Sequence, residues 1–160
     1  MPQTRQPISR AFNQRDIIYL VVGLTALALD SWFKWLVNNG ARWPNQEAWF
    51  EFGFYPNPDF IGSIELPSRA IIGISVVILF CVIILTAYSI VRHYPQMIVG
   101  GVWIILGGFS NLFDRVCFGW AVDYFGFDYN IPVFNLADVM ILIGVGLLLW
   151  AVFTKPKKVP

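Results

Sequence analysis

Four long apolar stretches dominate the pattern of hydrophobic and polar positions along this chain. They cover residues 17–37, 70–91, 96–113 and 133–153. At a helical rise of about 1.5 Å per residue, each corresponds to roughly 27–33 Å, which is the thickness of a hydrocarbon core. A buried helix of a soluble protein would be interrupted sooner and would show a polar stripe. The pattern therefore predicts four membrane-spanning helices.

The composition agrees with this prediction. The chain has 160 residues, of which 57% are hydrophobic and 13% charged, and its mean hydropathy is +0.62. These values exclude a disordered chain, a nucleic-acid-binding tail and an ordinary soluble domain. The length allows one domain. We therefore expect an all-α membrane protein that forms a single integral membrane domain over residues 1–160.

The positions of the basic residues predict the orientation in the membrane. Seven of the eleven lie in the N-terminal segment, the turn after the second span and the C-terminal tail, namely Arg5, Arg10, Arg15, Arg92, Lys155, Lys157 and Lys158. The two longer loops, 38–69 and 114–132, contain most of the acidic residues. Because basic residues concentrate on the cytoplasmic side, both termini are predicted to be cytoplasmic and both longer loops extracytoplasmic.

The first of these loops has an aromatic, alternating pattern at residues 50–55, which is followed by the turn-rich segment 56–59. Such alternation is typical of a short β-strand. We expect a small extracytoplasmic β-like element here, lying on the membrane surface.

Ionisable residues in or beside a span are costly unless they are paired or functional. Asp30 and Lys34 are four residues apart on the first span, so they share a helical face and can pair. The alternative is a structural ion pair at the interface, with Lys34 extending toward the headgroups. Asn111 and Arg115 are also four apart, at the end of the third span. The alternative there is a solvated pair between Asp114 and Arg115.

Two further acids stand near the outer ends of the spans. Asp123 lies in the apolar segment 120–125, which we expect to dip toward the membrane, and Asp138 lies in the first turn of the fourth span. Asn135 precedes Asp138 by three residues and shares its face. Asp138 could simply cap the helix. However, two carboxylates that meet in a low-dielectric site share a proton, so that one can activate water and the other can protonate a carbonyl or a leaving amine. This is the chemistry of an aspartic peptidase.

Other catalytic chemistries fit the sequence less well. The only histidine, His93, lies in the turn assigned to the cytoplasmic side and cannot act as a base for Ser110. One histidine and two separated cysteines, Cys81 and Cys117, do not make a zinc site. We expect no metal and no cofactor. A small ion- or proton-conducting protein is disfavoured because the acids gather at one interface rather than along a path.

Four segments resemble the lipoprotein signal peptidases, the bacterial type II signal peptidases, over residues 12–154. Residues 107–115 (GGFSNLFDR) resemble the family's Gly-Gly, Asn and Asp-Arg stretch, and residues 119–124 (GWAVDY) resemble its Gly, Val and Asp-Phe segment. Residues 134–138 (FNLAD) resemble its Phe-Asn and Ala-Asp segment, and residues 30–34 (DSWFK) its Asp and Lys on the first span.

The resemblance implies an intramembrane aspartic endopeptidase of the bacterial inner membrane. It would remove signal peptides from prolipoproteins by cleaving before a diacylglyceryl-modified cysteine, with its active site on the extracytoplasmic side. Its partners would be these substrates and membrane lipid, but not nucleic acid, and a monomer is expected. The catalytic pair would be Asp123 and Asp138. The residues that position substrate or pair would be Asn111, Arg115, Asn135, Asp30, Asn57 and Lys34.

The sequence also departs from the family's pattern. In the first outer loop, Asn57 and Ser63 align with the family's motif, but Gly62 replaces an aromatic residue and Asp59 adds a charge. Ser110 stands where the family tends to have Gly. These changes concern substrate fit more than catalysis, and they leave open a catalytically silent homologue that binds lipoproteins.

Overall fold

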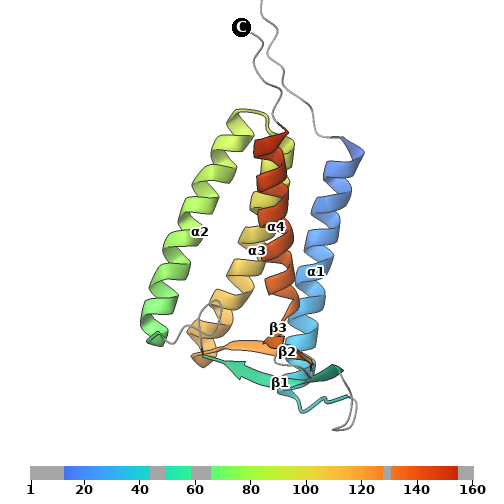
Figure 1. The fold of residues 1–160 in the computed structure, drawn as a ribbon, viewed down its shortest axis with the longest axis vertical. Coiled ribbons are helices and arrows are strands. Elements are labelled where there is room, and N and C mark those ends of the chain that lie inside the picture. The colour runs from blue at the N-terminus through green and yellow to red at the C-terminus, as the bar shows by residue number, and fades with distance from the viewer. Residues whose placement is uncertain (1–12, 44–49, 59–65, 128–130, 155–160) are drawn as a thin grey trace, which may run out of the picture.

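The computed structural model describes residues 13–43, 50–58, 66–127 and 131–154, and this part of the chain forms four helices and a small sheet (Figure 1). The helices are α1 (Gln14–Asn38), α2 (Ser68–Val91), α3 (Pro95–Phe118) and α4 (Leu136–Phe153). Each is long and apolar enough to cross a membrane. The prediction of four spans is therefore confirmed.

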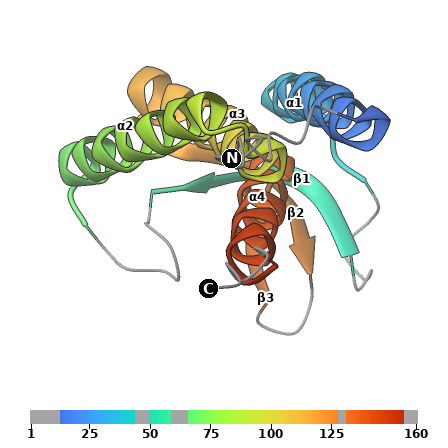
Figure 2. The ribbon, with the colours of Figure 1, turned by 90° about the horizontal axis from the view of Figure 1, so that it is seen from above.

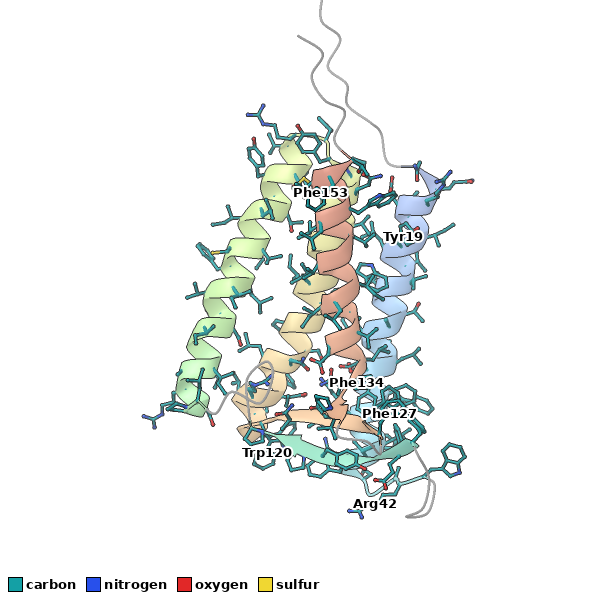
Figure 3. All side chains as sticks on the ribbon, viewed as in Figure 1. Tyr19, Arg42, Trp120, Phe127, Phe134 and Phe153 are labelled. Carbon is teal, nitrogen blue, oxygen red and sulfur yellow. The ribbon has the colours of Figure 1, made fainter. Side chains whose placement is uncertain are left out.

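The third helix is the centre of the bundle. Helices α1, α2 and α4 all pack on α3. Helix α1 also packs on α4, but α2 packs mainly on α3 and stands apart from α1 (Figures 1 and 2). α1 begins and α4 finishes at the same end of the bundle, and the sheet covers the opposite end (Figure 1). Phe127 and Phe134 lie at the sheet end, far from Tyr19 and Phe153 (Figure 3). Large apolar side chains cover the outside of the helices, as a lipid-facing surface requires.

The sheet is antiparallel and contains β1 (Phe50–Asn57), β2 (Ala121–Phe127) and β3 (Ile131–Phe134) in the order β1-β2-β3. The predicted strand in the first outer loop is thus confirmed as β1. The sequence predicted a β-like element in the first outer loop only, whereas the second outer loop also contains β2 and the beginning of β3. Each strand gains backbone hydrogen bonds that an isolated strand would lack.

Aromatic packing fixes this sheet to the first helix. Val122 and Tyr124 of β2 are completely buried, and they form a core with Val37 of α1. The ring of Phe33 lies 5.6 Å from that of Phe52 and 5.4 Å from that of Tyr124. Such aromatic pairs contribute about 0.5–1.5 kcal/mol each beyond the area that they bury. The position of β2 relative to α1 is therefore set by side-chain packing.

The third helix extends beyond its predicted end at residue 113. Its last helical residue is Phe118, and Gly119 forms the C-cap. The φ of Gly119 is 89°, a left-handed conformation that glycine adopts without steric cost. Asp114 and Arg115 therefore belong to α3 and not to the outer loop. The reason is that Asp114 is buried and paired with Lys34 of α1, so a charged residue continues the helix instead of ending it.

The fourth helix begins later than predicted, at Leu136 rather than at residue 133. Residues 133 and 134 belong to β3, and Asn135 caps the helix, its side chain accepting the N–H of Asp138. The first helix begins three residues earlier than predicted because Asn13 and Asp16 form a capping box. The second begins two residues earlier, at Ser68.

Glycines allow α3 and α4 to approach closely. A Cβ atom added to Gly144 would lie 2.7 Å from the carbonyl oxygen of Gly100 and 3.0 Å from the backbone nitrogen of Ile104. Backbone atoms cannot move aside as a flexible side chain does. Small residues at such a crossing are the usual basis of helix packing in membranes.

We predict that Gly144→Ala lowers the free energy of unfolding of the detergent-solubilised protein by about 1–3 kcal/mol, because the added methyl group forces α3 and α4 apart. Gly146→Ala is the matched control, since a Cβ there meets no atom within 4 Å. Thermal unfolding followed by intrinsic tryptophan fluorescence measures both variants. Equal stability of the two would contradict this account of the crossing.

Candidate active site

A cluster of polar side chains is buried at the sheet end of the bundle, between α1, α3, α4 and β2. We call it the polar cluster. Its members are at most 9% exposed, apart from the less buried Asp138, and they are Asp30, Lys34, Ser110, Asn111, Asp114, Asp123, Tyr124, Asn135 and Asp138. Buried polar groups persist only when they are hydrogen-bonded or paired. The partners of each member therefore define what the cluster can do.

Asp123 projects from β2 and is 1% exposed. Its Oδ2 accepts a hydrogen bond of 2.7 Å from Nδ2 of Asn57, and its Oδ1 accepts one of 2.6 Å from Nδ2 of Asn135. Burial and the charge of Asp138 raise the pKa of Asp123 to about 7, although both hydrogen bonds and the charge of Lys34 act in the opposite direction. This carboxyl group can therefore hold a proton near neutral pH.

Asp138 occupies the first turn of α4 and uses its two carboxylate oxygens differently. Oδ2 accepts the backbone N–H of Asn135 at 3.1 Å, which completes a capping box. Oδ1 accepts a hydrogen bond of 2.7 Å from Nδ2 of Asn111 on α3. The capping interpretation is thus confirmed, and it does not exclude a second role, because one oxygen caps the helix while the other faces the cluster.

Two asparagines connect the acids. Asn135 donates from Nδ2 both to Asp123 and, at 2.9 Å, to Oδ1 of Asn111. Asn111 in turn donates to Asp138. A continuous series of hydrogen bonds therefore joins Asp123 to Asp138 through Asn135 and Asn111. The fold brings together groups from β2, α3 and α4 that the sequence only placed near the same membrane face.

Lys34 is enclosed by acceptors. Its Nζ lies 3.0 Å from Asp30 and 2.8 Å from Asp114, and it also donates to Ser110 at 2.8 Å and to Asn111 at 3.2 Å. The predicted Asp30–Lys34 pair is confirmed. The alternative in which Lys34 extends to the interface is wrong, because the residue is only 5% exposed. Two carboxylates offset the cost of removing the ammonium group from water.

The alternative of a solvated Asp114–Arg115 pair is also wrong. Asp114 is buried, and it accepts hydrogen bonds from Lys34 and from the backbone N–H of Val122. Arg115 is half-buried and donates from Nη1 to the carbonyl oxygen of Asn111 at 3.4 Å. Its guanidinium group acts electrostatically on Asp123 and Asp138. The predicted site residues Asn57, Asp30, Lys34, Asn111, Arg115 and Asn135 all lie in or beside the cluster.

Sequence reasoning did not select three members of the cluster as site residues. Ser110 hydrogen-bonds both Lys34 and Asp30, Asp114 pairs with Lys34, and the hydroxyl of Tyr124 bonds to Asp30. Ser110 and Asp114 are four residues apart, so the same helical periodicity that identified Asn111 and Arg115 could have identified them. No sequence signal indicated Tyr124.

Comparison with known proteins identifies the family. The model of the signal peptidase II family matches residues 21–154 of this chain. The chain belongs to the signal peptidase II family. The lipoprotein signal peptidase of Moorella thermoacetica is 32% identical over 82% of this chain and 90% of its own length, and that of Wolinella succinogenes is 31% identical over 89% and 99%. A solved bacterial membrane enzyme shares the fold, with a TM-score of 0.70 at 20% identity, covering 95% of this chain and 98% of its own.

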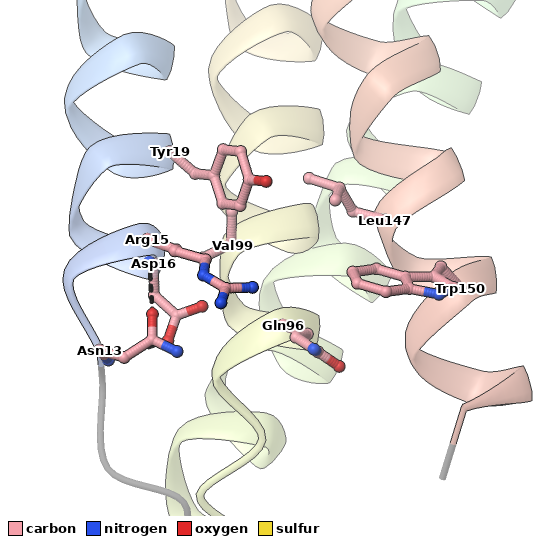
Figure 4. A pocket seen from close by; sticks show the side chains of 8 residues that line it. All are labelled: Asn13, Arg15, Asp16, Tyr19, Gln96, Val99, Leu147 and Trp150. Carbon is pink, nitrogen blue, oxygen red and sulfur yellow. Dashed lines mark hydrogen bonds between the residues drawn. The ribbon is translucent and has the colours of Figure 1, made fainter.

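Membership of the signal peptidase II family makes this chain a protease, and its four helices make it a multi-pass membrane protein. The polar cluster is the chemically distinctive part of that fold. A separate small pocket lies at the opposite end, near the start of α1, lined by Asn13, Arg15, Asp16, Tyr19, Gln96, Val99, Leu147 and Trp150 (Figure 4). Within the described residues, no group of three or more His, Cys, Asp or Glu side chains is placed to hold a metal ion.

We predict that Lys34→Met destabilises the protein by about 3–5 kcal/mol, because it leaves Asp30 and Asp114 buried without their counter-charge. Arg69→Met, at an exposed position, serves as the control. The double variant Lys34→Met/Asp114→Asn should recover part of the loss, since it removes one of the unpaired charges. Thermal unfolding in detergent measures all three, and a Lys34→Met variant as stable as Arg69→Met would contradict the assignment.

Proposed function

We propose that this signal peptidase II removes signal peptides from prolipoproteins, with Asp123 and Asp138 as an acid–base pair. The proposal rests above all on one observation, the series of hydrogen bonds that joins these two buried acids through Asn135 and Asn111. Prolipoproteins as substrates follow from the family and from the names of its relatives. Cleavage before a diacylglyceryl-modified cysteine follows from the resemblance of the motifs.

In the proposed reaction the pair begins with one proton. The ionised carboxylate takes a proton from a water molecule, whose oxygen forms a bond to the scissile carbonyl carbon. The protonated carboxyl group donates its proton to the carbonyl oxygen. When the tetrahedral intermediate collapses, the C–N bond breaks, the leaving amine takes a proton from the pair, and a hydroxyl group of the intermediate returns a proton to the pair as the carbonyl group of the new carboxylic acid forms. One water molecule is consumed, and the pair returns to its starting protonation state.

The neighbouring residues supply orientation and charge. Asn57 and Asn135 each donate to one oxygen of Asp123, which fixes the plane of that carboxylate. Arg115 places a positive charge beside both acids, where negative charge develops on the substrate's carbonyl oxygen. We assign to Asn111, Arg115 and Asn57 the positioning of substrate and pair. Ion conduction is less consistent with this arrangement, because the polar cluster occupies one end of the bundle only.

The proposal includes the location of the reaction. The two loops that form the sheet follow the ends of α1 and α3, whereas Arg15 and Arg92 stand at the other end of the bundle. By the positive-inside rule the sheet and the polar cluster face the extracytoplasmic side of the bacterial inner membrane. A lipid-modified substrate would then reach the pair laterally, from the outer leaflet. Of the variant segment 57–63, residues 59–63 lie outside the described residues.

We predict that Asp123→Asn or Asp138→Asn abolishes cleavage of a diacylglyceryl-modified precursor, because either change removes one half of the acid–base pair. Asp16→Asn is the matched control, since Asp16 completes the capping box of α1 as Asp138 completes that of α4. Gel-shift cleavage assays with the purified enzymes measure the effect. If Asp138 served only as a cap, the Asp16 and Asp138 variants would lose similar amounts of stability and both would remain active.

The wild-type enzyme in the same assay tests the alternative of a catalytically silent homologue, and cleavage of the precursor by the wild type would exclude it. A silent homologue would bind the lipidated precursor and leave it uncut, whatever residue stands at positions 123 and 138.

The proposal also predicts a bell-shaped dependence of kcat on pH. Because the pKa of Asp123 is raised to about 7, the pair keeps its shared proton below that pH and loses it above. Above it both groups are ionised and no acid remains, so kcat falls about tenfold per pH unit. At low pH the second carboxylate is protonated and the base is lost. Single-turnover cleavage from about pH 4 to 9 measures this profile, and constant kcat across the alkaline range would count against the pair.

A further inference from the structure

The beginning of α4, which contains Asp138, is held by side chains from two other elements of the fold and from its own N-cap residue. A helix leaves its first backbone N–H groups without partners in the helix itself. Here the N–H of Leu136 donates to the hydroxyl of Tyr124 at 2.9 Å, that of Ala137 to Oδ1 of Asp30 at 3.2 Å, and that of Asp138 to Asn135 at 2.9 Å. The first turn of α4 is thus fixed by β2, α1 and its own cap.

Asp30 is the common partner in this arrangement, and it is completely buried. Its Oδ1 accepts from Tyr124 at 2.9 Å as well as from Ala137. Its Oδ2 accepts from the hydroxyl of Ser110 at 2.6 Å and lies 3.0 Å from Nζ of Lys34. Four donors therefore hold one carboxylate. Its negative charge also lies at the N-terminus of α4, where the helix dipole favours it.

The two hydroxyl groups in this set each have one defined role as donor and one as acceptor. Tyr124 accepts from Leu136 and donates to Asp30, whereas Ser110 accepts from Lys34 and donates to Asp30. Burial and the charge of Asp30 raise the pKa of Tyr124 far above its usual range, so its hydroxyl stays a donor at every working pH. In the family's motifs, Phe stands at the position of Tyr124 and Gly at the position of Ser110. Neither of these residues has a hydroxyl group.

We propose that the hydroxyl groups of Tyr124 and Ser110 are positioning groups of the site, which fix Asp30 and the first turn of α4 and thereby hold Asp138 opposite Asp123. This inference rests on the proposed function, because it assigns a role relative to the aspartate pair. Neither hydroxyl group takes part in the reaction. Loss of the Tyr124 hydroxyl removes the partner of the partly buried N–H of Leu136, and the first turn of α4 then shifts to reach another.

The test compares Tyr124→Phe and Ser110→Ala with two control variants that lose the same groups elsewhere. Tyr88→Phe removes an exposed tyrosine hydroxyl at the opposite end of the bundle, and Ser89→Ala removes a buried serine hydroxyl that donates to the carbonyl oxygen of Leu85 in the same helix. We expect kcat on a diacylglyceryl-modified precursor to fall about tenfold in the two site variants, with KM changed less than twofold, and to stay unchanged in the controls.

The pH profile separates positioning from general loss of structure. Asp123 is faced by Asp138 from α4, Arg115 from α3, Lys34 from α1 and Asn57 from β1. If Asp138 moves away, its repulsion of the Asp123 charge weakens, and the alkaline limb of kcat shifts to lower pH. Hydrogen–deuterium exchange at Leu136 and Ala137 should also become faster in Tyr124→Phe. A fall in kcat that follows thermal stability and leaves the alkaline limb in place would overturn the proposal.

Asp123→Asn, assayed in parallel, distinguishes failure of this inference from failure of the proposed function. If that variant remains active, the aspartate pair itself is wrong, and the positioning role is wrong with it. If it is inactive while Tyr124→Phe and Ser110→Ala match their controls in kcat, pH profile and exchange, only the positioning role is overturned.

Discussion

The interaction on which the rest of this structure depends is the burial of Lys34 between Asp30 and Asp114. An ammonium group in a membrane-spanning bundle is stable only if its counter-charges come with it. The two carboxylates belong to α1 and α3, so satisfying the charge fixes the rotation and depth of these two helices relative to each other. The same constraint extends α3 beyond its apolar run, because Asp114 must remain helical to reach the lysine.

The residues of this ion pair also contact the two elements that contain Asp138 and Asp123. Asp30 receives hydrogen bonds from the beginning of α4, and Asp114 receives one from Val122 of β2. Helix α4 and strand β2 are thereby placed relative to the α1–α3 pair, and with them Asp138 and Asp123. The buried network provides a frame in which two carboxyl groups that repel each other are held near one another.

The sheet adds what helices alone could not supply. A helix end can present a side chain such as that of Asp138, but a second acid must approach from outside the bundle. Strand β2 does this, since its aromatic contacts with α1 keep it against the helix ends while Asp123 points into the cluster. Pairing with β1 then brings Asn57 to the same carboxylate. Burial of Asp123 in this position raises its pKa, which a solvent-exposed loop would not do.

Much of this could be predicted from local patterns. The length of the apolar stretches predicted the four spans, and the alternation of aromatic residues at 50–55 predicted β1. Helical spacing predicted the Asp30–Lys34 pair and the shared face of Asn135 and Asp138. These are properties of neighbouring residues, and periodicities of 3.6 and 2 encode them directly. The ends of α3 and α4 were misplaced because their causes are not local. One is a salt bridge to α1, and the other is the pairing of residues 131–134 into the sheet.

The sequence by itself thus determined that the chain crosses a membrane four times, and which acids stand near the ends of its spans. Only the tertiary structure decided that Lys34 is buried rather than extended to the interface, that Asp138 both caps a helix and accepts a hydrogen bond from Asn111, and that Tyr124 and Ser110 bond to Asp30. Each of these depends on contacts between residues far apart in the chain. Such contacts arise when buried polar groups find partners during packing, and no periodicity along the chain records which partners they find.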